Sequence, residues 1–339
     1  MAPLELLFLS YEDVAGLALT DAEIIDVVAR GLRAHGEGTV VMPPKDHLTL
    51  DDRYGGHFNI LKGYVEDIDL AGVKVIGDYV GNHLLGLPSE IALLTLYDAR
   101  SGRPLAIMDA TLLTWMRTGA VSAIGARHLA RPGSTVLAQI GARGTAPWNV
   151  RLIDSLFELD EIRVTSLRPE SRERFAADLR EQLDTPVRVT ETVREAVEGA
   201  DIVIDASRLS APEVLVDRAW LKPGALVMPY GAVMSTSPDL PLVADRFVVD
   251  DWAQAAASQW GQYHALIERG DLTRAHVSAE IGQIVAGLAP GRERDDELIV
   301  FWHRGFAVSD VMLGELVLRR ARAAGIGQRL VLQADPRPV

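Results

Sequence analysis

The stretch that most constrains the fold runs from Ile107 to Ala146, because it combines a helix, a break, a strand and a loop of small residues. Its helix is dense in glycine, alanine and serine, which lets another backbone approach closely. Pro132-Gly133 ends that helix, since proline has no amide hydrogen to donate and glycine allows a left-handed turn. Thr135–Ile140 then predicts a buried strand that leads into the loop Gly141–Ala146 and a helix over Trp148–Phe157. A strand, a small-residue loop and a helix in this order are typical of α/β folds that bind a dinucleotide pyrophosphate.

The pattern on either side of this stretch predicts two domains. Strands and helices alternate from residue 135 onward, which predicts a doubly wound parallel sheet of the Rossmann type over residues 119–305. Residues 1–118 mix strands and hairpins as α+β domains do, and the tail predicts one helix over Ala307–Ala324 that packs back onto them, so residues 306–339 join the first domain. The fold class is therefore α/β, with a Rossmann-type sheet inserted in an α+β substrate domain, which the family resemblance described below implies to be the dimerisation domain as well. Other predicted strands are Leu4–Ser10, Ile60–Tyr64, Gly72–Tyr79, Ile91–Tyr97, Leu105–Met108, Glu161–Thr165, Asp201–Ala206, Ala225–Pro229, Phe247–Asp250 and Leu298–Phe301, and other predicted helices are Ile24–Ala34, Pro169–Leu183, Val193–Val197, Trp252–Glu268 and Ala279–Ala286.

Composition excludes several classes of function. The formal net charge of −13 argues against a nucleic-acid partner, because phosphates would be repelled. The chain has no cysteine, which excludes disulfides and thiolate metal sites and suits a cytoplasmic protein. Leu4–Leu9 is apolar but short, which predicts a strand rather than a signal peptide. No apolar run approaches the ~20 residues that a membrane helix needs. The histidines show no metal-binding spacing, so no metal is assigned, and Asp250-Asp251 before Trp252 predicts a helix N-cap.

Two pairs of residues are candidates for binding and converting a substrate. Arg117 and Thr118 lie just upstream of the cofactor loop and offer a guanidinium and a hydroxyl that can bind a carboxylate. Arg117 is expected at a helix start, where an ion pair between domains is the alternative role. His303 and Arg304 follow the last predicted strand, whose carboxyl end faces the ligand crevice in such sheets.

The residues after the second Rossmann strand bear on the choice of cofactor. Ser166 follows Glu161–Thr165, at the position where NAD-binding proteins carry an acid that binds the ribose 2′-hydroxyl. Arg168 and Arg172 come next, and arginines without that acid favour the 2′-phosphate of NADP over NAD. Ordinary surface arginines at a helix start are the alternative. The other residues expected to contact the cofactor follow predicted strands: Gly141, Ala142, Arg143, Gly144, Thr145 and Ser207.

Short motifs spread over the chain carry a resemblance to a known family. They are GVK from Gly72, RSGRPLAIMD from Arg100, MRTGAVSA from Met116, GADIVI from Gly199, WLKPGA from Trp220, VDD from Val249, AEIG from Ala279 and PGRERDDE from Pro290. Together they resemble the ornithine cyclodeaminase/mu-crystallin family over essentially the whole length. The C-terminal third, with VVDDWAQ, AEIGQIVAG and AAGIGQRLVL, is most similar to the branch that contains N-(2-amino-2-carboxyethyl)-glutamate dehydrogenase.

The resemblance implies an activity and a set of roles. It implies a homodimer that transfers a hydride at a carbon bearing an amino or imino nitrogen, with NAD or NADP as cofactor. Lys74 matches the active-site lysine of the family and Arg117 its arginine for the substrate carboxylate. Thr118 matches a threonine at the cofactor phosphates, and Lys45 stands where a second carboxylate-binding arginine is usual.

Three departures from the family pattern indicate a remodelled pocket. Arg143 replaces the middle glycine of Gly-x-Gly-x-x-Ala, where a Cβ should obstruct the pyrophosphate, unless the guanidinium binds a phosphate or Gly144 takes over the close approach. The catalytic aspartate usual after the strand Ala225–Pro229 is absent, since Val233 and Met234 cannot move a proton. Trp302-His303-Arg304-Gly305 stands where the family has Lys-Ser-x-Gly after the last strand. His303 is the candidate proton donor in place of the absent aspartate.

These observations predict an NAD(P)-dependent oxidoreductase of a biosynthetic pathway, acting on the C–N bond of an amino-acid-derived small molecule. Imine reduction and oxidative release of an amine are both open. One alternative is a cyclodeaminase type of ammonia lyase, in which the cofactor takes a hydride and returns it. The other is a ligand-binding member of the family whose chemistry is altered.

Overall fold

The chain folds into two compact units in the computed structural model, which describes residues 3–209 and 211–336. The discontinuous unit takes the residues up to Arg117 and those from Phe306 onward, and the inserted unit takes Thr118–Gly305. The boundary lies inside helix α4 (Thr111–Leu129), one residue before the expected one. Among the helices that the structure describes, none combines the length and apolar character of a membrane span.

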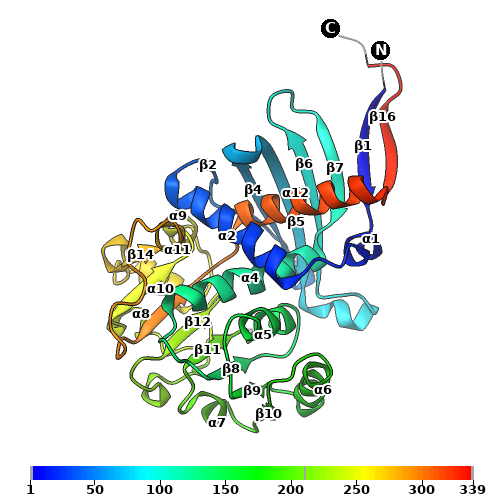
Figure 1. Cartoon of the computed structure of the whole chain (residues 1–339). Helices are drawn as coiled ribbons and strands as arrows, with labels where there is room; N and C mark the ends of the chain where they lie inside the picture. Colours follow the sequence, from blue (N-terminus) through cyan, green and yellow to red (C-terminus); the bar gives the residue numbers. More distant parts are fainter. Residues whose placement is uncertain (1–2, 210, 337–339) are drawn as a thin grey trace. The chain divides into compact units, whose positions relative to one another are not determined.

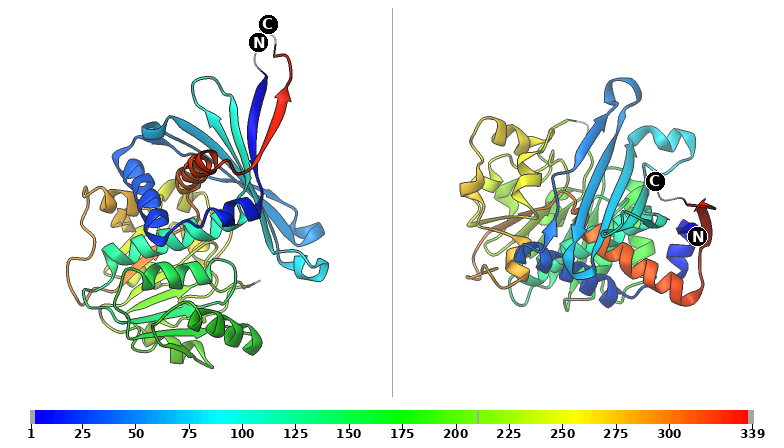
Figure 2. Two further views of the ribbon diagram at one scale, coloured as in Figure 1. Left: turned by 45° about the vertical axis from the view of Figure 1, so that its right-hand side comes forward. Right: turned by 90° about the horizontal axis from the view of Figure 1, so that it is seen from above.

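The discontinuous unit is built on one mixed sheet. The sheet has the order β16-β1-β7-β6-β5-β4-β2, with β3 paired to β4, and the neighbours are antiparallel except β1 and β7. Helix α12 packs on α2 and on strands β4, β5 and β6, as predicted for the tail, and crosses one face of the sheet (Figures 1 and 2). The elements of this unit are β1 (Leu4–Leu9), α1 (Tyr11–Gly16), α2 (Asp21–Glu37), β2 (Val40–Val41), β3 (Asp46–Thr49), α3 (Asp51–Tyr54), β4 (Gly56–Val65), β5 (Leu70–Tyr79), β6 (Glu90–Asp98), β7 (Pro104–Asp109), α12 (Ala307–Ala324) and β16 (Gln328–Gln333).

The inserted unit is a Rossmann-type domain. Its sheet has the order β10-β9-β8-β11-β12-β15-β13-β14, and every neighbouring pair is parallel. The strand order reverses between β8 and β11, and open α/β sheets bind ligands at the carboxyl ends of the strands on either side of such a reversal. Its elements are β8 (Val136–Ile140), α5 (Ala146–Asp154), β9 (Glu161–Thr165), α6 (Pro169–Arg180), β10 (Val187–Val189), α7 (Val193–Val197), β11 (Ile202–Asp205), β12 (Leu226–Pro229), α8 (Leu240–Val243), β13 (Arg246–Val249), α9 (Trp252–Ala256), α10 (Gln262–Glu268), β14 (Ala279–Glu280), α11 (Ile281–Val285) and β15 (Ile299–Trp302).

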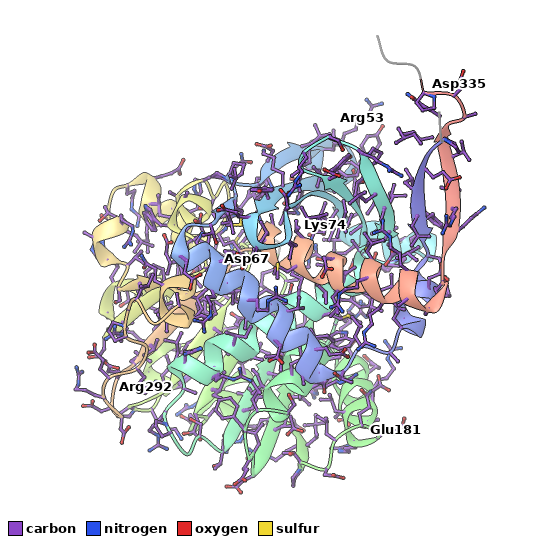
Figure 3. All side chains as sticks on the ribbon, turned by 45° about the horizontal axis from the view of Figure 1, so that its top comes forward. Arg53, Asp67, Lys74, Glu181, Arg292 and Asp335 are labelled. Carbon is purple, nitrogen blue, oxygen red and sulfur yellow. The ribbon has the colours of Figure 1, made fainter. Side chains whose placement is uncertain are left out.

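The glycines of α4 allow the close packing that its sequence predicted. A Cβ on Gly119 would lie 2.6 Å from the carbonyl carbon of Trp148 in α5, and one on Gly125 would lie 2.5 Å from the ring of Phe301 in β15. Arg292, labelled in Figure 3, ties the end of the same helix to two other segments, since its guanidinium donates to the carbonyls of Leu129, Gly224 and Glu297 at 2.7–3.0 Å. The motif around Pro290 therefore contributes to packing in this unit.

Several local predictions were wrong. The helix expected over Trp252–Glu268 is interrupted, because Gly261 adopts a positive φ of 100° and its Cβ position lies 2.7 Å from the carbonyl of Val233. Ala279–Glu280 form a short strand before α11, and α5 begins two residues before its predicted start at Trp148. Strands β3, β10 and β16 were not predicted.

Candidate active site

The loop after β8 has the geometry of a dinucleotide-binding turn. Gly141 has a positive φ of 91°, and a Cβ on it would lie 2.6 Å from the carbonyl oxygen of Ala206, so only glycine fits between these two segments. Gly144 also has a positive φ, of 60°, and α5 starts after Thr145. The loop thus leads from the strand at the reversal point into a helix N-terminus, whose amides and dipole favour an anion.

Arg143 reaches from this loop toward the next crossover. Its side chain is exposed, and its Nη2 lies 3.4 Å from the hydroxyl oxygen of Ser171 in the first turn of α6. Ala142 beside it is half-buried. The guanidinium of Arg143 therefore lies near the turn between β9 and α6, where the adenosine ribose binds in dinucleotide-binding folds.

The residues of the turn between β9 and α6 differ in exposure and in hydrogen bonding. Ser166 directly follows β9 and is half-buried, and Arg168 precedes α6 with an exposed side chain. Arg172 donates instead to the carbonyl of Glu191 at 3.1 Å. Arg168 and Arg143 are accordingly exposed cations beside this turn.

A buried carboxyl that the sequence analysis missed ends β11. Asp205 accepts a hydrogen bond from the amide of Ser207 at 3.0 Å and one from the hydroxyl of Ser235, and burial raises the pKa of its carboxyl. Ser235 belongs to the segment in which the family's aspartate was expected. An acid directly after the buried run of GADIVI was the available signal.

His303 belongs to a polar cluster at the carboxyl ends of the strands. Its ring is buried, with Nε2 3.2 Å from the hydroxyl oxygen of Ser122 on α4, and it stacks on Tyr230 with the ring centroids 5.2 Å apart. The hydroxyl of Tyr230 pairs with that of Thr145 and accepts from the amide of Asn149 at 3.5 Å. The cluster joins His303 to the start of α5, and Tyr230 is a further residue that the sequence analysis missed.

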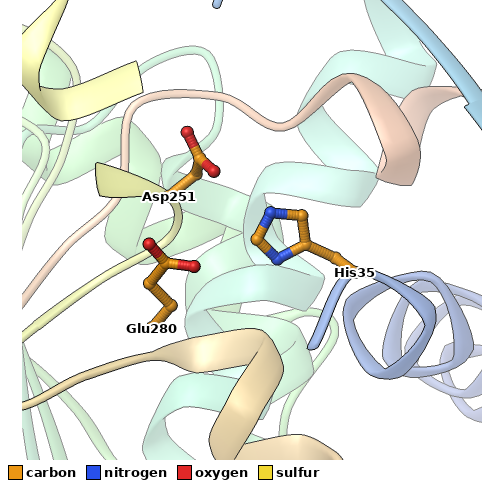
Figure 4. A group of neighbouring side chains, drawn as sticks. All are labelled: His35, Asp251 and Glu280. Carbon is orange, nitrogen blue, oxygen red and sulfur yellow. The ribbon is translucent and has the colours of Figure 1, made fainter. Parts of the chain in front are cut away.

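Arg304 is held inside the inserted unit. Its backbone amide donates to Asp250 at 2.6 Å, its guanidinium donates to the carbonyl of Gln254 at 2.5 Å, and burial lowers the pKa of the guanidinium to about 10. Burial also raises the pKa of Asp250 to about 6. Asp251 is the N-cap of α9, as predicted, because its carboxylate accepts from the amide of Gln254 at 2.6 Å. Glu280 accepts from the amide of Trp252 at 3.1 Å, and the carboxylates of Asp251 and Glu280 are labelled in Figure 4.

A second cluster is buried in the discontinuous unit. Lys74, labelled in Figure 3, lies on the interior strand β5 and is 1% exposed. Its ammonium donates to Oδ1 of Asp310 on α12 at 2.7 Å and to the hydroxyl of Thr114 at 3.0 Å. Nε of Arg117 donates to the same Asp310 oxygen at 3.0 Å. Burial, followed by the charge of Arg117, lowers the pKa of Lys74 to about 8.

Arg117, Thr118 and Lys45 are the remaining predicted site residues, and the surroundings of Arg117 differ from those expected. Arg117 stands in the second turn of α4, not at its start, and its ion pair with Asp310 lies within one unit. Thr118 is buried, and its carbonyl accepts from the hydroxyl of Ser122 at 3.3 Å. Lys45 is half-buried in the connection between β2 and β3.

Known proteins resemble this chain over nearly its full length. N-((2S)-2-amino-2-carboxyethyl)-L-glutamate dehydrogenase of Staphylococcus aureus is 28% identical and covers 97% of this chain and 99% of its own. The Δ1-pyrroline-2-carboxylate reductase of Thermococcus litoralis, solved with NADH and L-proline, is 28% identical with a TM-score of 0.89, over 95% of this chain and 99% of that one. An archaeal alanine dehydrogenase dimer with bound NAD is 27% identical with a TM-score of 0.88, over 97% and 99%. The model of the ornithine cyclodeaminase/mu-crystallin family matches residues 5–325, and the chain belongs to that family.

Proposed function

We propose that this chain is an NAD(P)-dependent oxidoreductase that acts on the C–N bond of an amino-acid-derived substrate. The observation that carries the proposal is the loop after β8, where Gly141 fits against the loop after β11 at the reversal point of a parallel sheet. Relatives of similar length are dehydrogenases and reductases of such substrates, and two of the solved ones hold NAD or NADH. The same residues therefore suit a nicotinamide dinucleotide here.

The roles of the site residues follow from their chemistry. A nicotinamide held by the loop after β8 would supply the hydride for an imine carbon, or would accept it from an amine carbon in the reverse direction. Arg117 and Lys45 bind the carboxylate of the substrate, and Lys74 polarises the substituent of the reacting carbon. Arg304 is a further candidate cation for the substrate on the inserted unit. His303 moves the proton: in reduction one proton and one hydride add across C=N to give the amine, and oxidation returns both.

NADP is the proposed preference. Three observations support a site for a 2′-phosphate. Ser166 replaces the acid that would bind a 2′-hydroxyl, the guanidinium of Arg168 is exposed, and the guanidinium of Arg143 contacts Ser171. Thr118, Ala142, Gly144, Thr145 and Ser207 are proposed to complete the contacts with the rest of the cofactor.

We further propose a cytoplasmic homodimer. Val75 and Leu93 face each other on β5 and β6 and are 39% and 47% exposed, on the sheet face opposite the buried Lys74. Ile91 on the same strand as Leu93 is 44% exposed. An exposed apolar sheet face of this kind fits a second copy of the chain, and one of the solved relatives is a dimer.

The experiment is a nicotinamide absorbance assay of the purified chain with NADH and NADPH. The panel contains Δ1-pyrroline-2-carboxylate and 2-oxo acids with ammonia, and amino acids with the oxidised cofactors. Net oxidation or reduction of the nicotinamide is the expected result. Ammonia release from L-ornithine or L-lysine without absorbance change would support the cyclodeaminase alternative, and dinucleotide binding without any turnover would support the ligand-binding alternative.

Arg117→Lys tests the carboxylate contact in the same assay. Loss of a planar, bidentate guanidinium should lower kcat/KM by roughly a hundredfold, since a buried charge-assisted pair contributes a few kcal/mol. The melting temperature should change little, because a cation remains beside Asp310. A variant with near-native KM and kcat would remove Arg117 from the site.

A further inference from the structure

Three elements that are distant in the sequence deliver one carboxylate and two cations to a single buried point. Lys74 comes from β5, Arg117 from α4 and Asp310 from α12, and both cations bond to Oδ1 of Asp310 at 2.7 and 3.0 Å. We propose that Asp310 is a positioning residue, whose carboxylate holds Lys74 and Arg117 in the geometry in which they bind the substrate. This inference rests on the proposed function.

The carboxylate is fixed by the packing of its helix on the sheet. Asp310 lies in the first turn of α12, where a negative charge is favourable beside the helix N-terminus, and its side chain is 1% exposed. A Cβ on Gly72 would lie 2.8 Å from Cγ2 of Val311, and one on Gly314 would lie 2.5 Å from Cδ2 of Leu94. These glycines let side chains of the helix and of the sheet pack directly on the facing backbone, so α12 lies close to the strands and the position of the carboxylate is fixed by this packing.

The hydrogen-bond pattern leaves donors available for a second anion. The bond from Arg117 uses Nε, so neither Nη group takes part in it. The Lys74 ammonium has three hydrogens, and two of them serve Asp310 and Thr114. Two cations and one carboxylate carry a net charge of +1 when ionised, which a substrate carboxylate would neutralise at a buried site.

A purely structural ion cluster is the competing explanation, and the pKa of Lys74 separates the two. The charged groups that act on Lys74 are Arg117 on α4, which lowers its pKa, and Asp310 on α12 and Glu90 on β6, which raise it. Removing the charge of Asp310 should therefore lower the pKa of Lys74 further. If Lys74 acts in its charged form, the basic limb of the pH profile of kcat/KM must move with it.

The test compares Asp310→Asn with wild type and with a control on the same helix, Glu315→Gln. Glu315 pairs with Arg319 on the side of α12 that is partly exposed, so its loss should leave catalysis unchanged. For Asp310→Asn we expect kcat/KM for the best substrate to fall about a hundredfold. Each factor of ten corresponds to about 1.4 kcal/mol of lost transition-state stabilisation. The basic limb should shift to lower pH by about one unit, and the Kd for NADH and NADPH should stay within about twofold.

Other outcomes overturn the proposal. A lower melting temperature with unchanged kcat/KM and an unmoved basic limb would make Asp310 a structural residue only. If Asp310→Asn does not fold, Asp310→Glu is the deciding variant, because it keeps the negative charge and displaces it by one methylene. Its KM should rise about tenfold while the basic limb of the pH profile stays in place. A native KM in this variant would refute the positioning role. Absence of turnover in the wild type would instead refute the proposed function.

Discussion

Substrate binding should weaken as pH rises, because Lys74 loses its charge in the mildly alkaline range rather than above about pH 10. Burial and the charge of Arg117 lower the pKa of Lys74 to about 8. If the substrate binds only when Lys74 is in its ammonium form, the apparent Kd grows with one plus the ratio of neutral to charged lysine. For a pKa of about 8 this factor is about eleven at pH 9, and the Kd then rises about tenfold per pH unit.

The assay is calorimetric titration of the cofactor-loaded protein with the 2-oxo acid that binds most tightly, without ammonia, from about pH 6 to about pH 9.5. A 2-oxo acid has no amine that titrates in this range, so the pH dependence reports the protein. Lys74→Met should bind more weakly at pH 7 and show no slope. A wild-type Kd that stays constant between about pH 7 and pH 9 would refute the reasoning.

The same pKa shift acts on stability with the opposite sign. The pKa is lowered from 10.5 in a free lysine to about 8 in the folded chain, so the unfolded state binds more protons between these values. The free energy of unfolding contributed by Lys74 therefore rises with pH across this window, by an amount on the order of 3 kcal/mol at 1.36 kcal/mol per unit. As pH rises through this window, wild type should gain stability relative to Lys74→Met while its affinity for the substrate falls. A loss of both stability and affinity with rising pH would indicate general alkaline unfolding.

Substitutions at three further positions have defined outcomes. Arg143→Ala should weaken NADPH binding more than NADH binding and reduce its salt dependence, as calorimetry would detect, whereas tighter binding by Arg143→Gly would mean that the side chain only obstructs. Gly119→Ala should lower the free energy of unfolding by about 1–3 kcal/mol in denaturant titrations, because its Cβ would press on the backbone of Trp148, and unchanged stability would show that α5 shifts freely. Leu93→Arg should give a monomer by light scattering with NADPH affinity retained, and a persistent dimer would place the interface elsewhere.

The parts of the fold that follow a strong local pattern were predictable from the sequence. Glu161–Thr165, Val193–Val197 and Ala307–Ala324 have the bounds expected of them, because apolar periodicity and end signals agree there. The break near Gly261 was not predictable, since it depends on contact with a segment about thirty positions earlier. Strand β16 pairs along β1 although all its residues are exposed, so no burial pattern marks it.

The candidate site was predictable only in part, for a similar reason. Motifs made Gly141 and Lys74 candidates for the site, but a lone acid in a helix such as Asp310 looks like a solvent-exposed residue until its partners on other elements are known. Tyr230 likewise gains a role only from the neighbouring strand that brings His303 beside it. Such residues acquire their chemistry from tertiary contacts rather than from spacing.

The discontinuous unit imposes an order of events on synthesis of the chain. Lys74 and Asp310 are separated by 236 positions, and the inserted unit emerges between them as one continuous segment. At ~5–20 residues per second, roughly ten to forty seconds pass between completion of β7 and the appearance of α12. During that interval the nascent sheet has its apolar face uncovered while the Rossmann-type domain can already fold. Early contact with a chaperone should therefore benefit the folding of this chain more than that of a protein whose domains follow one another in sequence. A chain released at residue 305 should aggregate through its first seven strands.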